Sequence, residues 1–180
     1  NYLYPKDGAD IDNMSAKDRL VTNVDALETL AQLVHEGRTA NAEERNKLGK
    51  FRGWGGVDMT DVWNVDGLLR KGRKWDSSRL ENVTDVTNPY YRLGMVIKSL
   101  DPDGKRGVFD SIKQAALTSY YTPLPIAEAM NEYLSLAGYK GGGSMLDPSI
   151  GNGVFEGTMP KDMQQRTQIY GVELDWLTAQ

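Results

Sequence analysis

The sequence predicts an α/β protein in which a mainly helical region, residues 1–106, precedes the first βαβ portion of a larger fold, residues 107–180. Two observations support this prediction. Apolar residues recur at helical spacing through most of the chain. Near its end, two short apolar runs, Ser144 to Pro148 and Gln168 to Glu173, resemble strands and are separated by a glycine-rich turn.

The first helix is expected to begin near Asn23, because the chain up to about residue 19 is polar and turn-rich and resembles an arm. Thr22 or Asn23 would cap this helix, and Gly37 would end it. Its expected inward face consists of Leu27, Leu30, Ala31 and Val34.

A second helix is predicted after Asn41, which stands at capping-box spacing from Glu44. The segment Arg52 to Gly56 must turn, because it places Trp54 between glycines. We interpret Trp54 as a buried anchor of this helical pair, with a docking or stacking residue as the alternative.

Three more helices are predicted, at Arg92 to Leu100, Gly107 to Ala116 and about Pro125 to Ala137. In the second of these, Val108, Ile112 and Ala115 or Ala116 should face inward. In the third, the expected inward residues are Ile126, Met130, Tyr133 and Leu134.

The turn after the first strand has the sequence LDPSIGNGVFEG, Leu146 to Gly157. Gly151 and Gly153 would let the backbone approach a ligand without interference from a Cβ atom. Asp147 ends the first strand, and Glu173 ends the second about twenty residues past the turn, where a Rossmann-like unit holds a ribose. The glycine spacing does not fit the dinucleotide pattern, and Asp147 would repel a phosphate. A cationic ligand such as S-adenosylmethionine suits the acid better.

The segment Asp147 to Phe155 resembles the D/E-P-x-x-G-x-G-x-F motif of amino-methylating DNA methyltransferases. Tyr121-Thr122-Pro123 resembles the upstream Y-T-P element of the N6-adenine enzymes, and Gly171 to Asp175 resembles their G-x-E-x-D motif. Asn23 to Leu27, Gly37 to Ala40 and Phe51 to Gly56 resemble the leader of large methylase–helicase proteins of phages and conjugative elements.

This resemblance implies a Rossmann-like methyltransferase fold, present in part, that binds S-adenosylmethionine. Thr122, near Pro123, would hold the methionine carboxylate, and Asp147 would face the methionine amino group. Glu173 would bind the ribose, and Leu174 would lie against adenine. Phe155 either lines the pocket or belongs to the core. The cofactor-binding residues are therefore expected to be Tyr121, Thr122, Pro123, Asp147, Pro148, Gly151, Gly153, Phe155, Glu173 and Leu174.

No residue of this chain is expected to catalyse the transfer. The family's catalytic D/N/S-P-P-Y/F/W motif accepts hydrogen bonds from the target amine and stacks on the flipped base. The nearest match, Asn88-Pro89-Tyr90-Tyr91, lacks the second proline and is typical of a turn, although a permuted enzyme could use it. We expect the chain to be a piece of a longer protein, with the catalytic motif beyond residue 180.

Composition limits the other possibilities. The chain has no cysteine, which excludes disulfides and thiolate zinc sites, and no apolar run of membrane-spanning length. The net charge of −4 gives no global basic field, so DNA contacts would come from local patches such as Arg70 to Lys74, a loop otherwise expected to be merely solvated. His35, the only histidine, is expected at the surface near a helix end, so neither a metal site nor a catalytic triad is predicted.

We therefore expect a cytoplasmic, S-adenosylmethionine-dependent DNA adenine-N6 methyltransferase fragment that modifies the DNA of a mobile element against host restriction. The fragment alone should be inactive, and an unpaired sheet edge could allow self-association. The alternatives are a non-catalytic helical interaction module of a large phage or plasmid protein, and a methyltransferase that acts on RNA or protein.

Overall fold

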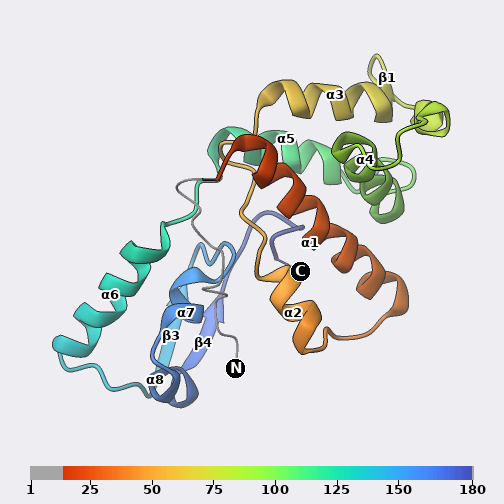
Figure 1. The fold of residues 1–180 in the computed structure, drawn as a ribbon. Coiled ribbons are helices and arrows are strands. Elements are labelled where there is room, and N and C mark those ends of the chain that lie inside the picture. Colours follow the sequence, from red (N-terminus) through yellow and green to blue (C-terminus); the bar gives the residue numbers. More distant parts are fainter. Residues whose placement is uncertain (1–13, 180) are drawn as a thin grey trace. The chain divides into compact units, whose positions relative to one another are not determined.

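The computed structural model describes residues 14–179, which form two compact units, residues 14–120 and residues 121–179. The first unit is mainly helical (Figure 1). Its elements are α1 (Ala16–Glu36), α2 (Ala42–Leu48), α3 (Met59–Leu69), β1 (Arg70–Lys71), β2 (Lys74–Trp75), the 3-10 helix η2 (Ser77–Asn82), α4 (Pro89–Leu100) and α5 (Val108–Thr118). Helix α1 packs against α2 and α4, and α3 packs against α4, α5 and η2.

Helix α5 sets the boundary between the units. The sequence placed this boundary after residue 106, which assigned α5 to the cofactor domain. In the structure α5 packs on α3 and α4, and the first unit continues to Tyr120. Its apolar residues Val108, Ile112, Ala115 and Ala116 are buried, as predicted from their spacing.

Helix α1 begins earlier than the sequence predicted. Ser15 caps it, since the Ser15 side chain accepts a hydrogen bond from the Asp18 amide at 3.1 Å. The expectation that Thr22 or Asn23 caps the helix was therefore wrong, as was a non-helical arm reaching to residue 19. The part of that arm in residues 1–13 lies outside the described residues. Gly37 ends the helix in the left-handed conformation, at φ 64°, as predicted.

The buried face of α1 also differs from the predicted one. Leu27 and Leu30 are buried as expected, but Val34 is exposed and Leu33 takes its place inside. The core face continues toward the helix start through Val24 and Leu20. The buried stripe therefore runs from Leu20 to Leu33 at spacings of three and four residues, and this spacing selects Leu33 and not Val34.

Asn23, within α1, instead organises the glycine-rich turn of the first unit. Its side chain is fully buried, accepts a hydrogen bond from the Arg52 amide at 2.8 Å and donates one to the Gly53 carbonyl at 2.7 Å. Trp54 is 1% exposed, and its ring meets Phe51 edge to face. The interpretation of Trp54 as a buried anchor is confirmed, and its burial leaves no surface for docking.

Side-chain caps define the starts of two more helices. Helix α2 carries the full capping box predicted for Asn41 and Glu44. Helix α4 begins with Pro89, and the Asn88 side chain accepts a hydrogen bond from the Tyr90 amide at 2.9 Å. Asn88-Pro89-Tyr90 is therefore the start of a helix and not the turn that the sequence suggested, and α4 begins before the predicted start at Arg92.

The basic segment Arg70 to Lys74 forms a two-stranded hairpin, β1–β2, rather than an unstructured loop. Arg70 pairs with Asp110 of α5 at 2.8 Å, which removes one positive charge from any phosphate-binding role. The other basic side chains, Lys71, Arg73 and Lys74, are exposed.

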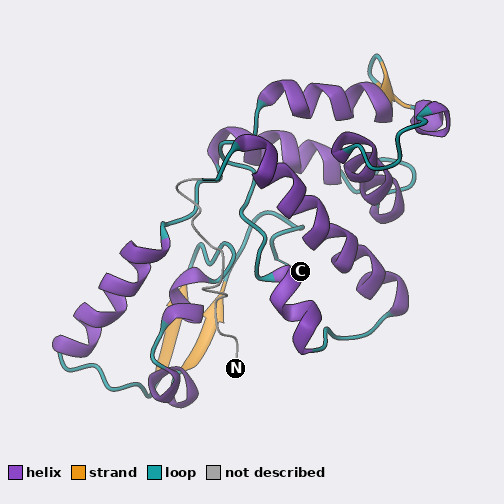
Figure 2. Ribbon diagram, viewed as in Figure 1, coloured by secondary structure: helices purple, strands orange, loops and turns teal. Residues whose placement is uncertain are grey.

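The second unit is a strand–helix–strand arrangement preceded by a helix. It contains α6 (Leu124–Leu136), β3 (Ser144–Asp147), α7 (Val154–Thr158), α8 (Lys161–Arg166) and β4 (Gln168–Gly171). Strands β3 and β4 pair in parallel, with Ser144 opposite Gln168 and Asp147 opposite Gly171 (Figure 2). Both strand predictions are confirmed, and α7 and α8 form the crossover that a parallel pair requires.

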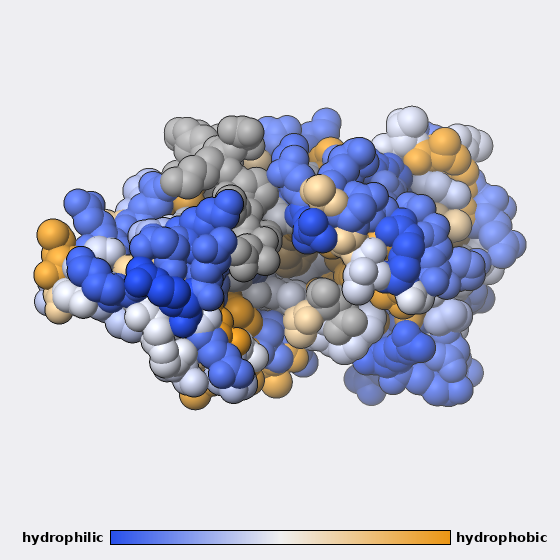
Figure 3. All heavy atoms as spheres, turned by 90° about the horizontal axis from the view of Figure 1, so that it is seen from below, coloured by the Kyte–Doolittle hydropathy of each residue, from blue (hydrophilic) through white to orange (hydrophobic). Residues whose placement is uncertain are grey.

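The apolar stripe of α6 is the largest departure from the predicted packing. Ile126, Met130 and Tyr133 are exposed, and Leu134 is only half-buried, whereas Ala127 and Asn131 face the interior against α7. The periodicity correctly identified an amphipathic helix. However, α6 contacts α7 through its face of smaller side chains and not through the predicted apolar stripe. Exposed apolar groups of this kind interrupt a mostly hydrophilic surface (Figure 3).

No helix within residues 14–179 combines the length and the apolar character needed to cross a membrane.

Candidate functional site

The glycine turn after β3 is held by backbone hydrogen bonds to the end of β4. The Ile150 amide donates to the Val172 carbonyl at 3.0 Å, and the Val172 amide donates to the Asp147 carbonyl at 2.9 Å. Gly151 and Gly153 have φ values of 55° and 73°, in the left-handed region that favours glycine. The two glycines thus turn the chain sharply at the carboxyl end of the parallel pair, where α/β proteins bind ligands.

Glu173 connects the second strand to this turn. One oxygen of its carboxylate accepts a hydrogen bond from the Gly151 amide at 3.0 Å, and the other accepts one from the Asp175 amide at 2.8 Å. The structure therefore brings together Gly151 and Glu173, two residues that the sequence assigned to one cofactor site from different motifs.

Tyr121 lies against the same turn. A Cβ atom at Gly151 would come within 3.0 Å of the Tyr121 ring, so the ring rests on the glycine backbone. The Tyr121 hydroxyl lies 3.0 Å from the Thr178 hydroxyl, and Thr178 donates to the Asp175 carboxylate at 2.6 Å. Three segments of the second unit, beginning at Tyr121, Gly151 and Glu173, meet at this point.

The other expected site residues have less uniform placements. Thr122 and Pro123 are half-buried between Tyr121 and the start of α6. Leu174, expected against adenine, is 99% exposed, so the described residues form no wall there. Phe155 is partly buried against the Ala127–Val154 core and also lines a pocket.

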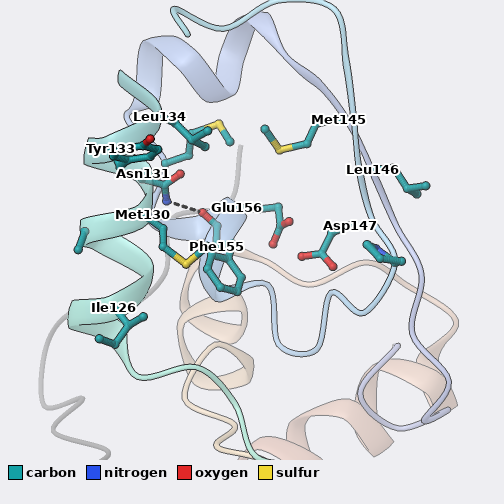
Figure 4. A pocket seen from close by; sticks show the side chains of 13 residues that line it. Ile126, Met130, Asn131, Tyr133, Leu134, Met145, Leu146, Asp147, Phe155 and Glu156 are labelled. Atoms are coloured by element: carbon teal, nitrogen blue, oxygen red, sulfur yellow. Dashed lines mark hydrogen bonds between the residues drawn. The ribbon is translucent and has the colours of Figure 1, made fainter. Parts of the chain in front are cut away.

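A pocket of about 540 Å³ opens between α6, β3 and α7 (Figure 4). Its lining is mainly apolar and includes Ile126, Met130, Leu134, Met145, Leu146 and Phe155. Asp147 and Pro148, two of the expected cofactor-binding residues, lie at one end of it. The titratable side chains that line the pocket are Tyr133, Asp147 and Glu156, and none of the lining residues is basic.

Asp147 and Glu156 point their carboxyl groups toward one another in this pocket (Figure 4). Asp147 also accepts a hydrogen bond from the Ser149 amide at 2.8 Å, which holds it at the mouth of the turn. Glu156 is 7% exposed, and no N–H group of the described residues donates a hydrogen bond to its Oε2, which leaves the Asp147 carboxyl as its polar neighbour. Burial, with the nearby Asp147 carboxylate as a second cause, raises the pKa of Glu156 to about 7.

Sequence reasoning missed Glu156, although a charged residue directly after Phe155, where helix α7 should face the core, was a visible signal. It also missed Asn131, which is buried on α6. The Asn131 side chain donates to the Phe155 carbonyl and to the Thr158 hydroxyl, both at 2.9 Å, and so fixes α7 on α6.

Two other candidate features carry structural roles. The Asn88 side-chain oxygen, which a permuted catalytic motif would direct at an amine, instead caps α4. His35 is exposed in the last turn of α1, as the sequence predicted.

A scan against protein-family models, a search of curated proteins and a search of solved structures each found no match to this chain.

Proposed function

We propose that residues 121–179 carry the methyl-donor site of a DNA adenine-N6 methyltransferase that uses S-adenosylmethionine. The observation that supports this most is the glycine turn between two acids, Asp147 and Glu173, at the same end of two parallel strands. The resemblance of these three motifs to one family assigned their residues to one ligand. Tyr121, from the upstream Y-T-P element, rests on Gly151.

The charge of the site favours this cofactor over a nucleotide phosphate. Asp147 and Glu156 both carry carboxyl groups into the pocket beside the turn, and no basic residue lines that pocket. A phosphate would meet only like charge there, whereas the methionine end of S-adenosylmethionine carries a sulfonium and an ammonium group. The apolar walls suit the uncharged part of the same end.

Glu173 retains the capacity to bind a ribose. Each of its carboxylate oxygens accepts one backbone hydrogen bond, and a carboxylate oxygen has two lone pairs. Ribose hydroxyls could therefore donate to Glu173 while the turn stays tied to β4. The exposed Leu174 would become covered by the adenine ring.

The methyl acceptor requires groups that this sequence does not contain. Its seven prolines are never adjacent, so no D/N/S-P-P-aromatic motif is present. We propose that the complete enzyme binds DNA and methylates an adenine of a mobile element to evade restriction, and that the chain by itself transfers no methyl group.

A second candidate function is a helical interaction module with an incomplete cofactor pocket. It is favoured by the helical first unit and by Leu174, which is exposed and meets no group within residues 14–179 that would complete an adenine site. Such a module would bind no S-adenosylmethionine.

Calorimetric titration of the chain with S-adenosylmethionine and with ATP tests the proposal. We expect S-adenosylmethionine to bind and ATP, which shares the adenosine but carries phosphates, to bind much more weakly. Asp147→Ala should abolish binding, whereas Asp162→Ala, which removes an exposed acid of α8, should not. The absence of cofactor binding, or equal binding by Asp147→Ala, would exclude the proposed site. Methylation assays of the complete gene product on DNA, RNA and protein identify the acceptor.

A further inference from the structure

The carboxyl pair of the pocket is an unfavourable arrangement in the free protein. Two acids face one another inside an apolar cavity, and neither meets a basic side chain among the residues that line it. The Glu156 Oε2 is buried and accepts no hydrogen bond from an N–H group of the described residues. Buried polar groups are nearly always hydrogen-bonded, and in the free protein the donor between these two acids is a proton that the carboxyl groups share.

A cation that forms hydrogen bonds can take the place of this proton between the two acids. A sulfonium group has no hydrogen to donate, whereas an ammonium group has three and can serve both acids at once. We infer that Glu156, together with Asp147, binds the α-ammonium group of the cofactor's methionine end, an inference that rests on the function proposed above. Glu156 is thereby a cofactor-binding residue outside the motifs that predicted the site.

Binding through this pair should be linked to a proton. Burial raises the pKa of Glu156 to about 7, so at pH 6 most of the free protein carries a proton that an ammonium group must displace. None of the polar groups around Glu156 carries a positive charge that would offset the charge of its carboxylate. Helix α6 contributes Tyr133, β3 contributes Asp147, and α8 contributes the uncharged Gln164, which donates to the Glu156 backbone at 2.8 Å.

The test uses the full chain and three ligands at pH 5 to 7, where an α-amino group stays charged. S-adenosylmethionine and S-adenosylhomocysteine both carry the ammonium group, and 5′-methylthioadenosine carries neither that group nor the carboxylate. For the first two ligands, affinity should rise by nearly tenfold per pH unit below pH 7. Titrations in buffers of different ionisation enthalpy at pH 6 should show release of about one proton per ligand. Binding of 5′-methylthioadenosine should be independent of pH.

Glu156→Gln keeps the shape of the side chain and removes its charge. At pH 7.5 the variant should bind S-adenosylmethionine and S-adenosylhomocysteine about ten- to a hundredfold more weakly, with unchanged affinity for 5′-methylthioadenosine. Glu132→Gln, an exposed acid on α6, is the matched control and should bind as the wild type does.

The outcomes separate this inference from the proposed function. If no ligand binds the wild type, the proposed function fails. If the ligands bind but Glu156→Gln retains full affinity, or no proton is released at pH 6, Glu156 does not bind the ammonium. A loss for S-adenosylmethionine alone would likewise overturn the assignment, because the sulfonium charge would then be the group recognised. The proton measurement on the wild type needs no variant and so does not depend on how the variant folds.

Discussion

At the scale of single residues, Glu156 shows how a ligand site can work against the stability of the protein that carries it. In the folded protein the pKa of Glu156 is raised to about 7, whereas in the unfolded chain it has the ordinary value of 4.5. Between these two values the folded state binds more protons than the unfolded state. The free energy of unfolding of residues 121–179 should therefore fall as the pH rises from 4.5 to 7, and then stay level.

The variant Glu156→Gln should remove this dependence. Above pH 7 it should stabilise the second unit relative to the wild type by at most about 3 kcal/mol, because the variant has no charge to desolvate. Urea unfolding at pH 5 and at pH 8 measures the difference. The control Glu132→Gln should follow the wild type at both pH values. A variant that loses stability with pH as the wild type does would show that Glu156 is not the responsible group.

Asn23 is the corresponding residue of the first unit. Replacing it by alanine would leave the Arg52 amide and the Gly53 carbonyl without their buried partners. We expect Asn23→Ala to reduce the free energy of unfolding of residues 14–120 by about 2–4 kcal/mol, since two buried polar groups lose a hydrogen bond each. Asn46→Ala, in the exposed surface of α2, should change it by less than about 0.5 kcal/mol. Chemical denaturation compares the two, and equal effects would contradict the role given to Asn23.

At the scale of elements, the glycine turn after β3 can be tested against a second glycine of similar backbone conformation. Gly151 and Gly143 have φ values of 55° and 69°, but only at Gly151 would a Cβ atom meet another group, the Tyr121 ring at 3.0 Å. Gly143→Ala should therefore cost about 1–2 kcal/mol from backbone strain alone. Gly151→Ala should cost more and should also weaken binding of S-adenosylmethionine, because the ring of Tyr121 must move.

Thermal unfolding and cofactor titration of both variants measure these effects. Gly143→Ala lies before β3, away from the turn, and should keep the affinity of the wild type. If the two variants lose stability equally and both bind the cofactor, the contact between Tyr121 and the turn has no part in the site.

The sequence predicted elements well where local chemistry decides them. The capping box at Asn41 and the helix end at Gly37 both depend on residues a few positions apart. The start of α1 was missed because Ser15 lies in a polar stretch that resembled an arm, and the apolar stripe before Asn23 is interrupted by charged residues. The parallel pairing of β3 and β4 followed from the short crossover predicted between them.

At the scale of the whole molecule, periodicity alone could not tell which apolar faces are covered. The stripe of α6 has the spacing of a core face, yet it borders an open pocket, because the contact with α7 is made through Ala127 and Asn131. The boundary between the units could not be predicted from the sequence either. Helix α5 is amphipathic, and which elements cover its apolar face, here α3 and α4, is decided only in the folded structure. The acid pair in the pocket depends on the same tertiary arrangement, which brings Glu156 to Asp147.

The second unit leaves apolar side chains exposed on α6 and on both strands, including Leu136, Leu146 and Tyr170. Within the described residues β3 and β4 pair only with each other, so each has a free edge. Both features agree with the proposal that this unit is part of a larger sheet, and both favour self-association at high concentration.

A ¹H–¹⁵N spectrum of the chain titrated with S-adenosylmethionine shows directly whether the glycine turn binds the cofactor. If the turn binds the cofactor, the amide signals of Gly151, Gly153 and Glu173 should shift in saturable fashion, together with that of Glu156. Signals of residues 14–120 should stay in place, and ATP at equal concentration should leave the four signals unchanged. If the signals of these four amides do not shift, or shift equally with ATP, the glycine turn is not a specific site for S-adenosylmethionine.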